Sequence, residues 1–352
     1  MSKFLLWLVS FYTFVRMNVL RKLLLPIVPI YYLITWFRNK MYDLGIKKST
    51  SYEFPVIVVG NLSVGGTGKS PMVEYLIRLL KDHTSIATLS RGYKRKTKGF
   101  QIVKTSSEAI DVGDEPLQFK TKFEDVLVGV DADRRNGILQ LRSQDPQPEL
   151  LILDDAYQHR KVKAGFYILL TPYYDLYSKD IVLPTGNLRE PRSGAQRANI
   201  IVVTKCPSSI TAQERERIKE KLNVLPNQSL FFTSIAYENT LVGTQGVQSI
   251  EKFQQLPFTL VTGIANPGPL VNYYHELGLK FEHLNFPDHH NFTDKDLEKL
   301  KRCERIITTE KDYVRLSKQL DDTTELWYQP ISVSFIVAQE LFDQKILECI
   351  KK

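Results

Sequence analysis

The sequence predicts an α/β protein with a mostly parallel β-sheet, a smaller α/β lobe toward the C-terminus and an apolar N-terminal segment. Short apolar runs without strict alternation recur along the chain, as in strands that are buried on both faces. Segments with helical spacing lie between these runs, and this alternation favours a parallel sheet. With 352 residues, 43% of them apolar, the chain can bury a large core, which excludes a disordered or collagen-like protein.

The strands of the main core are predicted from apolar runs at Pro55–Gly60, Ile86–Leu89, Val126–Val130, Leu150–Leu153, Tyr167–Leu170 and Ile200–Val203. The clearest helix follows the first of these strands, where apolar residues have the i, i+3, i+4, i+7 spacing of one buried face. These residues are Val73, Leu76, Ile77 and Leu80.

A second group of apolar runs begins near residue 230 and predicts the smaller α/β lobe. The runs lie at 229–232, 258–262, 305–308 and 331–336, with a helical stretch at 294–302. We therefore expect an N-terminal segment over residues 1–50, a main core over 51–228 and the C-terminal lobe over 229–352.

The positive charge of the chain is concentrated at its N-terminus. Of the formal net charge of +8, residues 1–50 contribute +7, because their eight basic residues face Asp43 alone. This charge lies in an apolar segment and not on a folded basic surface, so we expect no nucleic-acid partner. Cys206, Cys303 and Cys349 form no CxxC pair, which excludes a disulfide framework and a structural zinc site and favours a reducing compartment.

The N-terminal segment predicts association with a membrane surface. Its apolar runs, 4–15 and 23–37, are too short to span, since a twelve-residue helix rises about 18 Å against a hydrocarbon core of roughly 30 Å. Joining the runs would bury Arg16, Arg21 and Lys22 in hydrocarbon. Shallow insertion, with these cations near anionic lipid, fits the pattern. A single tilted span, an export signal and a buried helix remain alternatives, although no small-residue cleavage site follows the first run.

A glycine-rich loop predicts a phosphate-binding site. The segment SVGGTGKSP at 63–71 stands between the strand PVIVVGN and an amphipathic helix, which is the context of a P-loop. Glycine lets backbone N–H groups converge on phosphates, Lys69 neutralises phosphate charge and Ser70 can ligate Mg²⁺. The pattern GxxxxGK[ST] opens on glycine, but Ser63 stands there, so a glycine-rich turn is the alternative. The candidate nucleotide-binding residues are Ser63, Val64, Gly65, Gly66, Thr67, Gly68, Lys69 and Ser70.

An acidic pair at the end of another predicted strand suits a metal site. Asp154 and Asp155 end the run LLILDD, as metal-binding carboxylates of P-loop proteins do, although a pair that caps the next segment is the alternative. The DxxG and [NT]KxD patterns that GTPases usually contain are absent, because the corresponding segments read DDAYQ and TKCP. We therefore expect ATP and Mg²⁺ as cofactors.

Three loops carry further candidate groups. Asp114 in VGDEP is suited to accept the proton of a substrate hydroxyl, with His289 in NFPDHHNF orienting it. Arg189 in PTGNLREPRSG is suited to stabilise a transferring phosphoryl group, and Glu190 to hold Mg²⁺. The alternatives are a turn or cap residue for Asp114, a surface or metal-binding histidine for His289, and an exposed salt bridge for the last two.

These segments together resemble the ordered motifs of the tetraacyldisaccharide 4′-kinases of lipid A biosynthesis. From about residue 20 almost to the C-terminus the chain contains, in order, VGNLSVGGTGKSP, SRGYKRK, VGDEP, LDDAYQHR, LPTGNLREP, FPDHHNF and TTEKDYVRL. The resemblance implies a P-loop kinase that transfers the ATP γ-phosphate to the 4′-hydroxyl of an acylated glucosamine disaccharide 1-phosphate. It also implies a peripheral or monotopic protein at the cytoplasmic face of the inner membrane, because the substrate's acyl chains stay in the bilayer.

The resemblance also implies a role for each motif residue. Lys69 and Ser70 match the P-loop residues, Asp154 and Asp155 the metal-binding pair, and Asp114 and His289 a catalytic dyad. Residues that match motifs lining the nucleotide or substrate cleft are Tyr93, Glu115, Arg134, Gln158, His159, Arg189 and Glu190. The chain departs from the family pattern at Ala156-Tyr157, where Gly-Phe is usual, and at Ser70, where Thr is frequent. A membrane-associated P-loop ATPase or switch protein is the alternative function.

Overall fold

The computed structural model describes residues 21–288, 290–320 and 324–351. The chain forms two compact units that alternate along the sequence. Unit 1 contains the described residues up to Lys69, Asp155–Thr233 and those from Phe335 onward, and unit 2 contains Ser70–Asp154 and Ser234–Ser334. The predicted division at residues 50 and 228 stays a prediction. The apolar run 4–15 lies outside the described residues.

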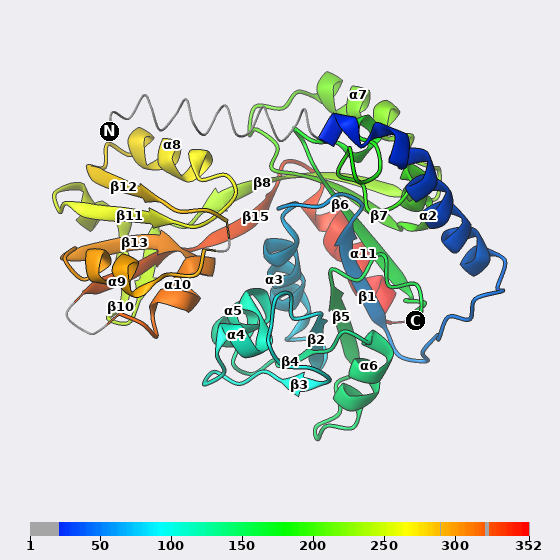
Figure 1. The fold of residues 1–352 in the computed structure, drawn as a ribbon, viewed down its shortest axis with the longest axis horizontal. Coiled ribbons are helices and arrows are strands. Elements are labelled where there is room, and N and C mark those ends of the chain that lie inside the picture. The colour runs from blue at the N-terminus through cyan, green and yellow to red at the C-terminus, as the bar shows by residue number, and fades with distance from the viewer. Residues whose placement is uncertain (1–20, 289, 321–323, 352) are drawn as a thin grey trace. The chain divides into compact units, whose positions relative to one another are not determined.

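The larger sheet is mostly parallel, as the sequence predicts (Figure 1). One part of this sheet has the strand order β15-β8-β7-β6-β1, in which β1, β6 and β7 belong to unit 1 while β8 and β15 are each divided between the units. Their bounds are β1 (Val56–Asn61), β6 (Phe166–Pro172), β7 (Ile200–Thr204), β8 (Ser229–Tyr237) and β15 (Ile331–Phe335). β6 pairs in parallel with β1 and with β7, and every residue of β1 and β7 is buried, which explains their continuous apolar sequence.

Helices of unit 1 lie before, between and after these strands. They are η1 (Leu25–Ile27), α2 (Val28–Asp43), η2 (Tyr177–Lys179), η3 (Arg192–Arg197), α7 (Ala212–Leu222) and α11 (Gln339–Ile350). Thr211 caps α7 through a capping box with Glu214. Among the described residues, none of the helices combines the length and apolar character that crossing a membrane requires.

Unit 2 contributes the remaining strands of the larger sheet, in the order β5-β2-β4-β3. They are β2 (Ile86–Ser90), β3 (Gln101–Ile102), β4 (Leu127–Val130) and β5 (Leu150–Asp154), with β3 antiparallel to β4. The associated helices are α3 (Lys69–Leu80), α4 (Ala109–Val112), α5 (Asp114–Lys122) and α6 (Arg134–Arg142). The four apolar residues that predict α3 are fully buried, so this prediction is confirmed.

A smaller sheet completes unit 2 in the order β10-β9-β14-β13-β11-β12. Its strands are β9 (Thr240–Gly243), β10 (Gly246–Ser249), β11 (Phe258–Thr262), β12 (Phe281–Asn285), β13 (Arg305–Thr309) and β14 (Glu325–Gln329). Figure 1 shows β12, β11 and β13 side by side. Its helices are η4 (Ile250–Gln254), α8 (Gly268–Glu276), α9 (Asp294–Leu300) and α10 (Glu310–Leu316). Buried aromatic residues such as Phe253, Tyr274 and Trp327 fill its core.

A buried polar network joins three helices of unit 2. Lys122 of α5 places its Nζ 2.6 Å from Glu74 of α3 and 2.7 Å from Glu310 of α10. Gln118 Nε2 donates to both carboxylates at 2.8 Å. Burial first, and the charge of Glu74 second, raise the pKa of Glu310 to about 7, although Lys122 opposes the shift.

The raised pKa of Glu310 gives a testable pH dependence of stability. Between pH 4.5 and 7 the folded state binds more protons at this residue than the unfolded state, so ionisation of Glu310 lowers the free energy of unfolding as pH rises. The free energy of unfolding of Glu310→Gln, relative to that of the natural chain, should therefore increase by on the order of 1–3 kcal/mol from pH 5 to pH 8. Urea unfolding measures this difference. Glu298→Gln, at an exposed position of α9, serves as the control. A stability difference that stays constant with pH would contradict the assignment.

Candidate active site

The predicted phosphate loop connects β1 to α3. β1 ends at Asn61 and α3 begins at Lys69, so the residues between them form the strand–loop–helix arrangement that the sequence predicts. Gly65 and Gly68 have φ values of +110° and +86°, a backbone conformation that residues with a Cβ atom rarely adopt. Ser63 and Thr67 are buried, Val64 is exposed, and Ser70 is the second residue of α3.

Lys69 lies beside two oxygen acceptors at the end of this loop. Its Nζ is 3.2 Å from Asn61 Oδ1 and 3.6 Å from Asp155 Oδ1. Arg189 Nη1 donates to both oxygens of the same Asp155 carboxylate, at 2.8 and 3.0 Å. The carboxylate shared by these cations leaves a net positive charge, which suits the site to a phosphate anion.

Residues 183–190, here called the bridging loop, run alongside the phosphate loop. Ser63 and Leu188 form an isolated antiparallel bridge, and Val64 N–H donates to Asn187 O at 2.8 Å. Arg189 N–H donates to Leu62 O at 2.7 Å. Backbone hydrogen bonds therefore fix the position from which the Arg189 side chain reaches Asp155.

Glu190, predicted as a metal ligand, is 1% exposed and is held by three side chains. Its Oε1 accepts from Gln158 Nε2 at 3.0 Å and from Arg197 Nη2 at 2.7 Å. Its Oε2 accepts from Asn39 Nδ2 of α2 at 2.5 Å. Gln158 Nε2 also donates to Asn61 O at 2.9 Å, so these contacts link Glu190 to the end of β1. The half-buried His159 follows in the same turn.

Other predicted residues of unit 2 have defined surroundings. Asp154, the last residue of β5, is buried and accepts from Ser90 Oγ at 3.2 Å. The buried Arg134 donates from Nη1 to the backbone carbonyl of Asp131 at 2.9 Å, and Tyr93 is exposed. Among the residues described, no group of three or more His, Cys, Asp or Glu side chains is placed to hold a metal ion.

Asp114 forms a partly buried ion pair with Arg315. It begins α5, and its Oδ1 accepts from Arg315 Nε at 2.8 Å while Arg315 Nη2 contacts Oδ2. Arg315 Nη1 also donates to the backbone carbonyl of His290 at 3.0 Å. Burial disfavours the guanidinium charge, but the hydrogen bond and charge of Asp114 prevail, so that the pKa of Arg315 is raised. His289, predicted to act with Asp114, lies outside the described residues.

Glu115, the next predicted residue, also has a cationic partner on α10. Its Oε1 lies 3.6 Å from Nζ of Lys311, which is 3.8 Å from Asp288. The motif TTEKDYVRL therefore supplies a cation to each of two consecutive acidic residues. The sequence contained both cations but gave no sign of their partners.

Lys205 is a further residue that the sequence did not single out. Its Nζ donates to Gly66 O at 2.6 Å, and Thr204 Oγ1 donates to Thr67 O at 2.8 Å, so the end of β7 contacts the phosphate loop. Although the residue as a whole is exposed, burial of the ammonium group and then the charge of Lys69 lower the pKa of Lys205. The TKCP segment was the available signal, but it was considered only for guanine recognition.

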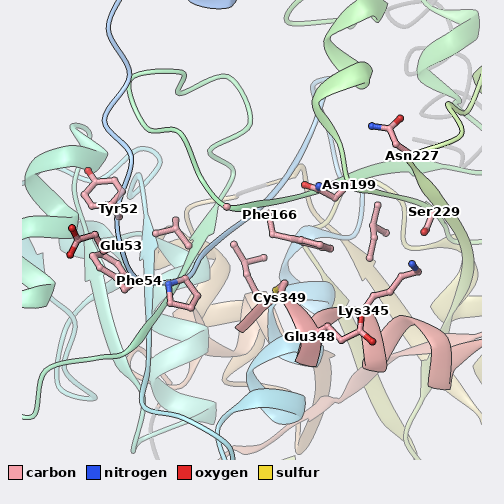
Figure 2. A pocket seen from close by; sticks show the side chains of 15 residues that line it. Tyr52, Glu53, Phe54, Phe166, Asn199, Asn227, Ser229, Lys345, Glu348 and Cys349 are labelled. Atoms are coloured by element: carbon pink, nitrogen blue, oxygen red, sulfur yellow. The ribbon is translucent and has the colours of Figure 1, made fainter. Parts of the chain in front are cut away.

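A separate cavity in unit 1 lies at the opposite ends of the strands. It measures about 450 Å³ and is lined by the first residues of β1, β6 and β7 and by α11 (Figure 2). These strands are parallel, and the phosphate loop follows the C-terminal end of β1. The cavity and the phosphate loop therefore lie at opposite ends of the strands. The predicted site residues are absent from the cavity lining within the described chain.

A glycine loop between a buried strand and a helix, with a lysine beside a strand-end carboxylate, defines a P-loop nucleotide-binding protein. The family model described as Tetraacyldisaccharide-1-P 4′-kinase matches residues 20–351. The chain is 53% identical to a tetraacyldisaccharide 4′-kinase of Flavobacterium johnsoniae, over 96% of this chain and 99% of that protein. Its identity to the enzyme of Flavobacterium psychrophilum is 48%, over 95% and 98% of the two chains.

A solved structure agrees with these matches. The crystal structure of the "apo" form of LpxK from Aquifex aeolicus in complex with ATP matches with a TM-score of 0.77 and 32% identity, over 94% of this chain and 99% of that chain. The chain therefore belongs to the tetraacyldisaccharide 4′-kinase family.

The contact of Lys205 with the phosphate loop can be tested by substitution. We expect Lys205→Met to weaken ATP binding by about three- to tenfold, since it removes a cation and a hydrogen bond that holds Gly66. Equilibrium binding of a fluorescent ATP analogue measures this effect. Lys219→Met, at an exposed position of α7, is the matched control. Unchanged affinity in Lys205→Met would show that this lysine does not act at the site.

Proposed function

We propose that the chain carries out the reaction of its family, with the phosphate loop, Asp155 and Arg189 handling the ATP phosphates. As a member of this family it is an ATP-dependent kinase of lipid A biosynthesis, which phosphorylates the 4′-hydroxyl of a tetraacyldisaccharide 1-phosphate to give the 1,4′-bisphosphate, lipid IVA. The observation that carries the assignment of residues is the carboxylate of Asp155 shared by Lys69 and Arg189 beside the glycine loop.

The nucleotide site follows from the chemistry of the phosphate loop. Backbone N–H groups of residues 63–70 surround the phosphates and Lys69 neutralises their charge. A triphosphate competes with Asp155 for Lys69, because each offers anionic oxygens to the same ammonium group. Arg189 then stabilises the charge that spreads over the transferring phosphoryl group.

The predicted metal ligands have the chemistry that Mg²⁺ requires. The Ser70 hydroxyl and the carboxylates of Asp154 and Asp155 are hard oxygen donors, and Mg²⁺ in kinases needs only one or two carboxylates besides phosphates and water. The predicted ligand Glu190 holds hydrogen bonds from Asn39, Gln158 and Arg197. When bound, Mg²⁺ would neutralise charge on the β- and γ-phosphates.

Asp114 is the proposed base for the 4′-hydroxyl proton, with His289 as its predicted partner. Arg315 orients the Asp114 carboxylate through two hydrogen bonds, and a carboxylate oxygen is the acceptor that the proton of the substrate hydroxyl needs. Glu115, Tyr93, Arg134, Gln158 and His159 remain predicted contacts of the substrate or nucleotide. We place His289 in this role on the motif alone.

Because the substrate is a lipid, we propose that α2 binds the membrane surface. Described residues of this segment expose large apolar side chains at Leu23, Leu24, Leu25, Ile27, Ile30, Tyr32, Leu33, Ile34, Trp36 and Phe37. Their apolar area suits shallow insertion, and the basic residues nearby suit anionic lipid. We therefore propose peripheral or monotopic binding at the cytoplasmic face of the inner membrane, where the acyl chains of the substrate reside.

Transfer of labelled γ-phosphate tests the reaction and the proposed base together. The natural chain should place the label on an organic-phase lipid when given the tetraacyldisaccharide 1-phosphate. Asp114→Asn should lower the turnover number by about 10²–10⁴-fold with little change in ATP affinity, because it removes the proton acceptor. Release of the label only as inorganic phosphate would favour the alternative, a P-loop ATPase or switch protein. Loss of ATP affinity in the variant would contradict the assignment of Asp114 as the base.

Arg315 is a proposed positioning residue, and its substitution has a distinct signature. We expect Arg315→Gln to lower the turnover number by about 10–100-fold and to move the acidic limb of its pH profile to higher pH, since loss of the guanidinium charge makes Asp114 harder to ionise. Arg315→Lys should restore part of both effects. Arg305→Gln removes a comparably buried arginine that pairs with Glu325, and it should leave the acidic limb in place. If the acidic limb of the pH profile does not move in Arg315→Gln, Arg315 has only a structural role.

A further inference from the structure

The bridging loop, residues 183–190, contacts the N-terminal segment as well as the phosphate loop. Arg21 Nε donates to Pro184 O at 3.1 Å, and Arg21 Nη2 contacts Gly186 O and, at 3.1 Å, Asn187 Oδ1. Thr185 Oγ1 donates in return to Arg21 O at 2.9 Å. One side of this loop is therefore bonded to the start of the helical segment that carries the exposed apolar residues.

Two side chains of α2 bond to the functional end of the same loop. Tyr31 Oη donates to Arg189 O at 3.0 Å, and Asn39 Nδ2 donates to Glu190 Oε2 at 2.5 Å. Asn39 is 8% exposed, so loss of its amide would leave the buried Glu190 carboxylate without a donor that water can readily replace. Burial first, and the charge of Glu190 second, raise the pKa of Tyr31, which keeps its hydroxyl protonated and able to donate.

The opposite face of α2 is apolar and exposed. Ile30, Leu33, Ile34 and Phe37 follow the i, i+3, i+4, i+7 spacing of one helical face, and each exposes 58% or more of its surface. Tyr31 and Asn39 lie eight positions apart and belong to the inward face. The helix thus presents hydrogen-bond donors to the bridging loop and an apolar stripe to its surroundings.

From these contacts we infer that binding of α2 to a lipid surface and binding of ATP to the phosphate loop are coupled through the bridging loop. Tyr31 and Asn39 are the positioning residues of this coupling. The occupant of the apolar stripe is a bilayer with anionic lipid, because the neighbouring exposed cations Lys22 and Lys40 complement its charge. The inference rests on the proposed function for this membrane contact.

The coupling has a physical source in the partners of Asp155. ATP draws Lys69 toward its phosphates and away from Asp155, while Arg189 either stays paired with that carboxylate or turns to the phosphates itself. Either change bears on the backbone carbonyl of Arg189, which Tyr31 holds. A ligand shifts an equilibrium only through such a difference in interaction between two states.

Reciprocity provides the test. With the full chain, the dissociation constant of a non-hydrolysable ATP analogue with Mg²⁺ is measured with and without vesicles of phosphatidylethanolamine and phosphatidylglycerol. Vesicle binding is then measured with and without the analogue. We expect each ligand to tighten binding of the other by the same factor, about fivefold or more, since linkage requires equal effects in both directions.

Substitutions at the two positioning residues assign the coupling to these contacts. Tyr31→Phe removes one hydroxyl and Asn39→Leu removes one amide, and each should bring the factor toward one while both binding events persist. Tyr174→Phe is the matched control, because it removes an exposed tyrosine hydroxyl of unit 1 outside these contacts and should keep the factor of the natural chain. If Asn39→Leu fails to fold, Tyr31→Phe alone decides the result.

A factor of one in the natural chain would overturn the inference, and so would a factor that both substitutions leave unchanged. Neither result touches the proposed reaction, because no lipid acceptor is present in this experiment. Failure of γ-phosphate transfer to the lipid would overturn the proposed function instead. Absence of vesicle binding would overturn the inference together with the membrane part of the proposed function.

Discussion

The carboxylate of Asp155, shared by Lys69 and Arg189, is the interaction on which the functional part of unit 1 depends. These side chains are partly exposed, so each pair contributes little to stability, up to about 1 kcal/mol. Their main effect is positional. They fix the ends of two cations beside a loop of backbone N–H groups and leave the site with positive charge. A phosphate anion therefore meets groups that are already oriented, which reduces the entropic cost of arranging them.

The bridging loop has irregular structure, but hydrogen bonds hold it on two sides. The bridging loop bonds to the phosphate loop through backbone groups and to α2 through side chains. A loop whose polar groups are paired on two sides can transmit a displacement, whereas a solvated loop absorbs it. The side chains of α2 that make these contacts and its exposed apolar stripe lie on different faces of the same helix. An enzyme that acts on a membrane lipid gains from this arrangement, because nucleotide binding and surface binding can then favour one another.

Unit 2 uses ion pairs in a different setting. Asp114 and Arg315 lie 201 positions apart in the chain. Lys122 contacts Glu74 and Glu310, which lie 48 and 188 positions from it, so this network joins three helices from distant parts of the sequence. Buried charges of this kind cost desolvation energy, so their value lies in fixing one arrangement of the helices. The raised pKa of Glu310 reflects this desolvation cost, because burial disfavours the charged carboxylate. The same helices carry Ser70, Asp114 and Arg315, which connects the network to the proposed chemistry.

The sequence alone determined the elements and the kind of chemistry. Apolar runs located β1, β2, β4, β5, β6 and β7 to within two residues, because a strand buried on both faces can contain little else. The short edge strand β3 was not predicted, and β8 extends five residues beyond its apolar run. The glycine loop was evident because phosphate binding requires a fixed local spacing. Only the tertiary structure decided the partners: Arg315 with Asp114, Lys205 with Gly66, and Asn39 with Glu190. Local spacing carries no information about such contacts, since hydrogen bonds between distant segments depend on how the sheet brings the ends of its strands together.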